Sequence, residues 1–373
     1  MMLYCHSGRW GTAHAKVERM TWCGDGGEGF GAVEGNTAVR SVLVTGANGF
    51  VGSSLTRALL ARGIRVRMTG QERSESLAAL GAEWFPMPDL SGEVDWSPTL
   101  AGMDAVVHLA AVAHRFESVT PEMCALYDQV NHRGTRSLAA AIAREPSVRR
   151  FLFISSVRVH GDPVSLPVRE DSPLAPMTPY DSSKVDAENA VREWLAPGIA
   201  RWAILRPAVV YGPGNRGNMA RLEGLLRSGL PVPLARKPNR RSFLFIGNLV
   251  GAIEAYLIAP DPPSGRTWIL ADEIPSSTEE LLRAMGRSMG VRTRALHLPD
   301  WILGGGARFG DICRKVGLPF PWTSEVKQKL LGDFFVDISA VKTELGWTPP
   351  YTLEEGIART YGTSEKQGGG PFS

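Results

Sequence analysis

The stretch Val44–Gly52 reads VTGANGFVG and contains three glycines, Gly46, Gly49 and Gly52. It follows a short apolar run at 41–45 and precedes a helical pattern at 50–62. Glycines between a strand and a helix permit a tight turn and let the backbone approach a pyrophosphate, whose charge the helix N-terminus attracts. The stretch therefore predicts a dinucleotide-binding loop inside the first strand–helix unit of an α/β sheet.

Strands and helices alternate along the first half of the chain. The pattern predicts further strands at 64–69, 83–86, 104–109, 150–155 and 202–207, and helices at 72–80, 122–144 and 180–195. After 207 the alternation weakens, with strands expected at 242–246 and 267–271 and helices at 248–258 and 278–289. The chain is predicted to be a Rossmann-like α/β protein, with a doubly wound parallel sheet and a smaller C-terminal substrate-binding cap.

The same pattern suggests how the chain divides. We expect an NAD(P)-binding domain over 39–210, with elements from about 242–260 interleaved, a cap over 211–241 and 261–362, and a flexible tail at 363–373. Residues 1–38 show no periodicity and are rich in glycine near their end. We interpret them as a disordered extension, or as translation from a start codon upstream of a true start at Met20 or Val39.

The composition is that of an ordinary globular protein. Its 373 residues are 43% hydrophobic and 21% charged, and the formal net charge of +3 is too small to suggest nucleic-acid binding. The four cysteines are scattered without a CxxC pair or a Cys/His ligand spacing, so neither a metal site nor a disulfide framework is expected. No apolar run approaches the ~20 residues that span a bilayer, and the N-terminus lacks the pattern of a secretory signal. We therefore expect a soluble, cytoplasmic protein without membrane insertion.

The end of the second predicted strand bears on the choice of cofactor. An acidic residue there would bind the ribose hydroxyls of NAD. The stretch 68–73 instead reads MTGQER, with no acid at the strand tip and with Arg73 within reach of a 2′-phosphate. This favours NADP over NAD, unless Arg73 is only the solvated partner of a helix start.

A second signal is the pair Tyr180 and Lys184 in the stretch YDSSK. Residues four apart share one face of a helix, so the phenol and the ammonium can lie side by side. A neighbouring cation lowers the pKa of a tyrosine from about 10 and makes it a usable acid or base. Ser155 and Ser156, at the end of a predicted strand, offer a hydroxyl that could bind the substrate oxygen.

In combination these motifs resemble the extended short-chain dehydrogenases/reductases that modify nucleotide sugars, known as the NAD-dependent epimerase/dehydratase family. The resemblance runs from Ser41 to Thr360. Besides TGANGFVG and YDSSK, its motifs are HLAA at 108–111, VN at 130–131 with GT at 134–135, SSVRVHG at 155–161, RPAVVYGPGN at 206–215, RRSFLFIGNLV at 240–250, and VDIS at 336–339 with LGW at 345–347.

The resemblance implies roles for the residues at matching positions. Tyr180 would exchange a proton with a sugar hydroxyl or ketone, Lys184 would bind the nicotinamide ribose and lower the Tyr180 pKa, and Ser156 would bind the same sugar oxygen. A further group would bind the cofactor: Gly46, Asn48, Gly49, Phe50, Val51, Gly52, Arg73, Asp89, Leu90, Leu109, Ala110, Ala111 and Asn131. Asn218 and Arg241 would hold the nucleotide diphosphate of a UDP-sugar, although the basic run 236–241 could also be a solvated loop.

At several positions the chain differs from residues typical of particular enzymes in this family, and these differences favour some reactions over others. Sugar dehydratases carry an acidic pair after the catalytic hydroxyl residue, where this chain has Val157 and Arg158, so dehydration is disfavoured. Ala113 and Val209 stand in place of residues usual in UDP-galactose 4-epimerases. The chain also lacks the acid that holds NAD firmly. An epimerase must retain its reduced cofactor whereas a reductase exchanges it, so these departures favour reduction.

The nearer resemblance is to bacterial enzymes that reduce UDP-4-keto-6-deoxy-N-acetylhexosamines during O-antigen synthesis. The leading hypothesis is thus an NAD(P)H-dependent reductase, in which hydride goes to C4 and Tyr180 donates the proton. The alternative is a 4-epimerase of the UDP-glucose or UDP-N-acetylglucosamine type. A non-catalytic cofactor-sensing or scaffold protein is a remote third, because the set of Ser156, Tyr180 and Lys184 is intact. The resemblance also implies a homodimer joined through 122–144 and 180–195, and the stretch 301–322 either covers the substrate or packs.

Overall fold

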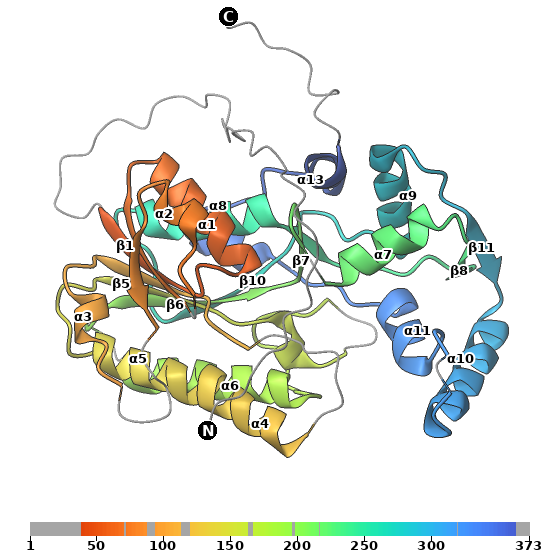
Figure 1. Cartoon of the computed structure of the whole chain (residues 1–373), viewed down its shortest axis with the longest axis horizontal. Coiled ribbons are helices and arrows are strands. Elements are labelled where there is room, and N and C mark those ends of the chain that lie inside the picture. Colours follow the sequence, from red (N-terminus) through yellow and green to blue (C-terminus); the bar gives the residue numbers. More distant parts are fainter. Residues whose placement is uncertain are drawn as a thin grey trace, which may run out of the picture. The chain divides into compact units, whose positions relative to one another are not determined.

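A parallel sheet of seven strands organises the structure, a computed structural model that describes residues 39–70, 72–87, 94–112, 120–162, 167–195, 198–215, 217–318 and 320–362 (Figure 1). Its strands are β1 (Ser41–Thr45), β2 (Arg65–Gly70), β3 (Glu83–Pro86), β4 (Ala105–His108), β5 (Arg150–Ile154), β6 (Arg201–Pro207) and β10 (Arg266–Leu270). Their order in space is β10-β6-β5-β4-β1-β2-β3. The order reverses at β1, which lies between β2 and β4. Ligands of open α/β sheets bind beyond the carboxyl ends of the strands at such a switch point.

Helices cover both faces of this sheet (Figure 1). One face carries α1 (Phe50–Ala61), α2 (Glu75–Ala78) and α8 (Ile246–Ile258), and the other carries α3 (Ser97–Leu100), α4 (Pro121–Tyr127), α5 (Gly134–Ile142) and α6 (Pro179–Trp194). Successive side chains of a strand point to opposite faces. Accordingly, Val42 and Val44 belong to the same buried cluster as Leu59 of α1, whereas Leu43 belongs to the cluster of α5 and α6. Both faces of β1 are buried, as is typical of a parallel sheet.

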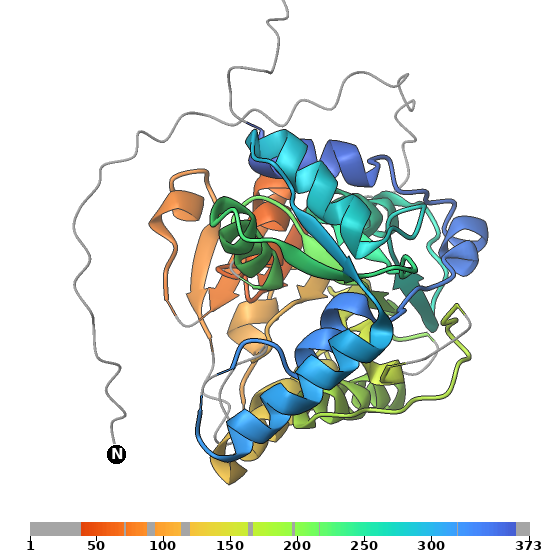
Figure 2. The same cartoon turned by 90° about the vertical axis from the view of Figure 1, so that its right-hand side faces the viewer.

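The chain after β6 builds a smaller region, seen from the front in Figure 2. Two short parallel pairs form its sheets, β7 (Val209–Tyr211) with β9 (Phe243–Phe245) and β8 (Val232–Ala235) with β11 (Ala295–Leu298). Its helices are α7 (Asn218–Arg227), α9 (Thr278–Met289), α10 (Asp300–Lys315), α11 (Ser324–Leu331) and α13 (Leu353–Tyr361). This region has its own buried cluster, which includes Tyr211 and Met285. By contrast, β10 returns to the large sheet, where α12 (Ser339–Glu344) packs against it.

The predicted α/β fold is confirmed, and the differences are local. The helix expected over 122–144 contains a π-helical turn, η1 (Asp128–Arg133), between α4 and α5. The helix expected at 72–80 is reduced to α2. The helix expected to start at Tyr180 starts at Pro179, because Thr178 and Asp181 form a capping box before and within its first turn. The predictions for 1–38, for 363–373 and for Asp89 and Leu90 concern residues outside the described ranges.

Candidate active site

The glycine loop between β1 and α1 has the backbone geometry that its sequence predicts. Gly46 has φ +68°, and a Cβ there would lie 2.8 Å from the Cα of Ala110 at the end of β4. A Cβ on Gly52 would overlap the Gly46 carbonyl oxygen. Gly49 is the N-cap of α1 and has no side chain, so no capping side chain occupies the N–H groups of the first turn. The loop can therefore hold a pyrophosphate against the helix N-terminus. The other predicted cofactor contacts here are Phe50 and Val51, which begin α1, and Leu109–Ala111, which follow β4.

The segment that follows the tip of β2 contains Glu72 and Arg73. The side-chain amide of Asn48, in the glycine loop, reaches across it and donates to the carbonyl oxygen of Glu72. The Nε of Arg73 lies 3.3 Å from Oε1 of Glu75 in the first turn of α2, and both side chains are more than half exposed. Arg73 thus has the solvated partner at a helix start that was the alternative to a 2′-phosphate.

Beneath the loop, Thr45 connects β1 to the end of β4. Its Oγ1 accepts from the backbone N–H groups of Leu109 and Ala110 at 3.2 and 3.1 Å, and lies 2.7 Å from Nδ1 of His108. These contacts fix the backbone that leaves β4 directly beside the glycine loop. Thr45 and His108 stand in the motifs TGANGFVG and HLAA, but sequence reasoning gave them no role, because the strand pattern shows only that their positions are buried.

His108 continues this connection to the helices on the other side. Its Nε2 lies 2.9 Å from Oγ1 of Thr135, which donates in turn to the carbonyl oxygen of Asn131 at 2.6 Å. Since Thr135 uses its hydrogen on Asn131, Nε2 carries the imidazole proton and Nδ1 accepts from Thr45. Burial, with a smaller contribution from the charge of Lys184, lowers the His108 pKa to about 3. The ring is therefore neutral at physiological pH.

Asn131, predicted to buttress the site, lies buried in the π-helical turn η1. Its Oδ1 accepts from the N–H of Val112 at 2.8 Å, and its Nδ2 donates to the carbonyl of Val112 at 3.1 Å and to Oγ of Ser183 at 3.0 Å. Ser183 Oγ donates to the carbonyl of Tyr180 at 2.8 Å. Hydrogen bonds thus link the exit of β4 to the first turn of α6. A π-helical turn often marks a functional site because it alters the directions of nearby side chains.

Tyr180 and Lys184 project from the first two turns of α6, four residues apart. The Tyr180 ring meets Tyr127 edge-on with 6.0 Å between centroids. Lys184 is buried, donates from Nζ to the carbonyl of Ile154 at 2.9 Å and lies 4.8 Å above the ring of Phe153. The carbonyl at the end of β5 therefore binds the Lys184 ammonium, next to the two serines that follow this strand.

The pKa of Tyr180 differs from the sequence-based expectation. Burial raises it to about 12, the charge of Asp181 adds to the rise, and Arg158 opposes it. The net shift is upward because removing the phenolate from water outweighs the opposing charge of Arg158, and a lowering by Lys184 stays a prediction. Burial also lowers the Lys184 pKa to about 8, against the charge of Glu188.

Arg158 forms a two-pronged ion pair with the residue that follows Tyr180. Its Nε and Nη2 lie 2.9 and 3.0 Å from the two carboxylate oxygens of Asp181, whose side chain is fully buried. Asp181 also accepts from the N–H of Thr178, the N-cap of the helix. Sequence reasoning noted Arg158 only as unable to replace an acid, whereas the structure shows it fixing the start of α6. The spacing of Thr178, Pro179 and Asp181 was the available signal for that start.

The two serines after β5 have different surroundings. Ser155 is buried and donates from Oγ to Oε1 of Glu188 at 2.6 Å. Ser156 is partly exposed, and its Oγ accepts from the N–H of Arg158 at 3.2 Å, at the start of the short helix η2 (Val157–His160). Ser155 is thus engaged beneath the site, which agrees with the choice of Ser156 as the substrate-facing hydroxyl.

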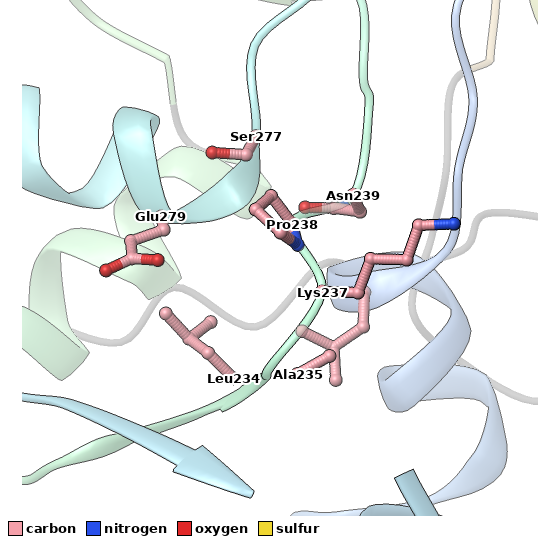
Figure 3. A pocket seen from close by; sticks show the side chains of 8 residues that line it. Leu234, Ala235, Lys237, Pro238, Asn239, Ser277 and Glu279 are labelled. Carbon is pink, nitrogen blue, oxygen red and sulfur yellow. The ribbon is translucent and has the colours of Figure 1, made fainter. Parts of the chain in front are cut away.

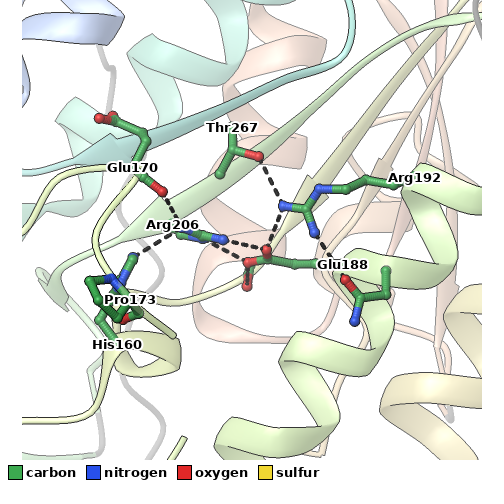
Figure 4. Close-up of polar contacts among 9 residues, drawn as sticks. His160, Glu170, Pro173, Glu188, Arg192, Arg206 and Thr267 are labelled. Carbon is green, nitrogen blue, oxygen red and sulfur yellow. Dashed lines mark hydrogen bonds and ion pairs between the residues drawn. The ribbon is translucent and has the colours of Figure 1, made fainter. Parts of the chain in front are cut away.

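Glu188 is the centre of a buried ionic network behind these residues (Figure 4). Arg206 of β6 donates to both of its oxygens at 2.9 and 2.6 Å, and Arg192 donates to one at 2.8 Å. Arg206 also contacts Nε2 of His160 at 3.0 Å and donates to the carbonyl of Glu170 at 3.2 Å. Because Ser155 binds the same carboxylate, the network ties β5, β6 and α6 together at the carboxyl end of the sheet.

The residues predicted to hold the diphosphate are only partly described. Asn218 begins α7, and its side chain lies outside the described parts. Arg241 donates from Nη1 to the carbonyl of Gly332 at 2.8 Å, and burial lowers the pKa of its guanidinium while the charge of Asp162, close after η2, acts in the opposite direction. Arg241 therefore lies near the segment that follows Ser156, but its role at a diphosphate stays a prediction.

A small cavity lies beside the same basic run (Figure 3). Its lining residues are Leu234, Ala235, Lys237, Pro238, Asn239, Ser277, Glu279 and Leu331. Its volume of ≈ 10 Å³ accommodates about one water molecule and no sugar. Asn239 donates there to Thr278 Oγ1 and to two backbone carbonyls. This part of the run therefore connects neighbouring segments of the fold rather than binding a ligand.

Burial of Lys184 makes a Lys184→Met variant more stable in the nucleotide-free protein. A lysine whose pKa falls to about 8 in the folded state costs stability below that pH, because the unfolded chain binds the proton more tightly. We expect a gain of about 1–3 kcal/mol in the free energy of unfolding at pH 7, measured by urea denaturation. The gain should shrink as the pH rises from 8 to 10.5, and a variant less stable than the unaltered protein at pH 7 would contradict the cause assigned here.

Comparison with known proteins agrees with this arrangement. The family model described as NAD dependent epimerase/dehydratase family matches residues 42–271. A UDP-glucose 4-epimerase of Vibrio cholerae is 32% identical over 324 residues, which cover 86% of this chain and 94% of that protein. An N-acetyl-alpha-D-glucosaminyl-diphospho-ditrans,octacis-undecaprenol 4-epimerase of Escherichia coli O157:H7 is 30% identical with the same coverage. A solved structure, MoeE5 in complex with UDP-glucuronic acid and NAD, is 25% identical with a TM-score of 0.65 and covers 86% of this chain and 97% of its own. The chain is therefore an enzyme of the NAD dependent epimerase/dehydratase family.

Proposed function

We propose that the protein is an NAD-dependent 4-epimerase of a sugar carried on a diphosphate. The observation that carries the proposal is that Lys184 of α6 donates to the carbonyl of Ile154 at the end of β5, two residues before Ser156. This is the same edge of the sheet as the glycine loop, which follows β1 at the switch point. In this proposal the region up to β6, with α8 and β10, binds the nucleotide, and the region after β6 binds the substrate. The relatives named above support epimerisation at C4.

The side chains supply proton transfer and positioning. The glycine loop would hold NAD, which would supply reversible hydride transfer at C4 of the sugar. As the phenolate, Tyr180 takes the proton of the C4 hydroxyl as the carbonyl forms and gives it back when the hydroxyl is restored. Because its pKa is raised to about 12 in the nucleotide-free protein, this reaction requires that the phenolate forms once nucleotide and substrate are bound. Ser156 donates a hydrogen bond to the same oxygen, and Lys184 supplies positive charge beside the phenol. Each proton taken up is returned, so the reaction needs no external acid or reductant.

The cofactor we propose is NAD. Arg73 is paired with Glu75 at the surface, which weakens the argument for a 2′-phosphate partner. The related solved structure holds NAD. The substrate's carrier is a diphosphate in both epimerase relatives, attached to uridine in one and to undecaprenol in the other. Asn218 and Arg241 are the proposed contacts for that diphosphate.

Reduction of a 4-keto sugar is the second candidate, and one observation favours it. With its pKa raised to about 12, Tyr180 keeps its proton at neutral pH and is ready to donate it to a ketone. Dehydration is not favoured, because Arg158 occupies the position after Val157 and is paired with Asp181.

Cofactor retention separates epimerase from reductase. The purified full chain is denatured, and the released nucleotide is identified by absorbance and mass, while separate samples receive UDP-glucose, UDP-N-acetylglucosamine or a 4-keto sugar. We expect NAD at close to one per chain, and interconversion of the C4 epimers without added coenzyme. Stoichiometric oxidation of NADPH by the 4-keto sugar, with no retained NAD, would show that the protein is a reductase and not an epimerase.

A further inference from the structure

Helix α10 lies at the surface of the smaller region (Figure 2), and several of its large apolar side chains are exposed. Trp301 is 76% exposed, Phe309 57%, Ile312 61% and Val316 67%. The spacing of eight and three residues places Trp301, Phe309 and Ile312 on one stripe, about 80° wide, of a helix with 3.6 residues per turn, and Val316, which caps the C-terminus of α10, follows them. Monomeric soluble proteins rarely expose so many large apolar groups together, and such a patch marks an interaction site.

The opposite stripe of α10 faces the protein. Leu303, Ala307, Gly310 and Cys313 are its buried residues. The indole N–H of Trp322 donates to the carbonyl of Leu303 at 3.0 Å, and a Cβ on Gly310 would overlap the backbone of Trp322. The helix therefore cannot rotate to bury its outer stripe, and Trp322 has the packing role that was one of the two expectations for this stretch.

The turn after α10 extends the outer stripe. Phe320 packs edge-on against Phe309 with 5.5 Å between centroids, and Leu318 is 59% exposed. We call the set Trp301, Phe309, Ile312, Val316, Leu318 and Phe320 the α10 face.

Positive charge borders the α10 face. Arg308 and Lys315 are exposed and lie on the helix beside Trp301 and Ile312. The acids of the helix lie on the same flank, farther from the apolar stripe, and both have partners. Asp300 pairs with Lys327 at 2.9 Å, and Asp311, which is near the charge of Lys315, accepts from the N–H of Ser324 at 3.0 Å. An apolar stripe edged by cations is complementary to a surface with apolar material below anionic groups.

We propose that the α10 face docks on an anionic lipid bilayer and holds the enzyme at the membrane surface. Trp301, Phe309 and Ile312 enter the boundary between headgroups and acyl chains, while Arg308 and Lys315 extend their charged ends to lipid phosphates. None of the helices in the described ranges is long and apolar enough to cross a bilayer, so the contact is interfacial. An enzyme held at the membrane surface meets substrates anchored there, so docking favours a sugar diphosphate attached to a membrane polyprenol as the substrate. This choice of substrate rests on the proposed function.

Vesicle sedimentation tests the docking. The full chain is mixed with vesicles of phosphatidylcholine containing phosphatidylglycerol, and with vesicles of phosphatidylcholine alone, at low and high salt. We expect binding to the anionic vesicles that weakens at least about tenfold in the double variant Trp301→Ser/Ile312→Ser. The control is Leu230→Ser/Ile274→Ser, which removes two side chains of similar exposure, 61% and 73%, from other elements and should bind normally.

The outcomes are distinguishable. No binding by the unaltered chain, or equal binding by both double variants, overturns the proposal. A fall in molecular mass of the α10 variant by light scattering, without vesicle binding by the unaltered chain, shows a contact between copies instead. In activity assays, the α10 variant should lose turnover only with a polyprenol-linked sugar in vesicles and keep it with a UDP-sugar in solution. Inactivity of the unaltered chain on both substrates would refute the proposed reaction but leave the vesicle result standing.

Discussion

A Tyr180→Phe variant is expected to lose about 10²–10⁴-fold in kcat while it binds NAD as tightly as the unaltered protein. The change removes only the hydroxyl that we propose exchanges a proton with the C4 oxygen. The ring keeps its place, because its contact with Tyr127 and the hydrogen bond from Ser183 to the Tyr180 carbonyl do not involve the phenolic oxygen. Turnover of the UDP-sugar and the affinity for NAD, measured by calorimetry, give the two quantities.

Tyr127→Phe is the matched control. Tyr127 lies against Tyr180 and is largely buried, but the proposed reaction gives its hydroxyl no task. We expect its kcat to change by less than about tenfold. Equal losses in the two variants would mean that the site needs the packing of the aromatic pair rather than a proton from Tyr180.

The second large effect concerns stability, where Arg206→Met should cost about 3–5 kcal/mol in the free energy of unfolding. Arg206 and Glu188 are both almost fully buried, and the change leaves the carboxylate without the cation that donates to both of its oxygens. Ser155 and Arg192 remain, but neither replaces two charged hydrogen bonds. Urea denaturation of the nucleotide-free protein measures the loss.

Arg192→Met provides the control for this prediction. It removes a cation from the same Glu188 oxygen, but the Arg192 side chain is 36% exposed, so water can take its place. We expect a loss of no more than about 1 kcal/mol. The double variant Glu188→Gln/Arg206→Met should recover part of the stability, because no buried charge is then left alone. A loss as large for Arg192→Met as for Arg206→Met would show that burial does not set the cost.

The parts of the site that sequence predicts are those held within one element or one turn. Gly46 and Gly52 act through backbone positions a few residues apart, and Tyr180 and Lys184 share a helix face. Their spacing alone carries the information, since local geometry follows from the period of the element.

The missed parts depend on residues brought together by the fold. Thr45 and His108 are 63 residues apart, and Arg158 and Asp181 are 23 apart. No local pattern marks such pairs, because the buried strand end and the helix start become neighbours only when the sheet assembles. The π-helical turn around Asn131 likewise carries no periodic signal in the sequence.

The choice between reduction and epimerisation also depends on more than local sequence patterns. Sequence reasoning placed reduction first, partly from Ala113, which lies outside the described residues, and from Val209, which is an exposed residue of β7. It also relied on a missing acid at the tip of β2, where Asn48 reaches instead. The first two positions are departures from residues usual in UDP-galactose 4-epimerases, and only the missing acid concerns how firmly NAD is held. The residue types at these positions alone do not decide the reaction. The similarity to two 4-epimerases supports the alternative.

The most direct test of epimerisation follows the hydrogen on C4. A UDP-sugar, or its polyprenol-linked counterpart, carrying deuterium at C4 is incubated with the purified protein, and the product is examined by NMR. The proposed reaction predicts an epimeric product that keeps deuterium at C4, because the hydride removed from that carbon returns to it, with no added coenzyme consumed. A product whose C4 hydrogen comes from solvent or from added NADPH would contradict it.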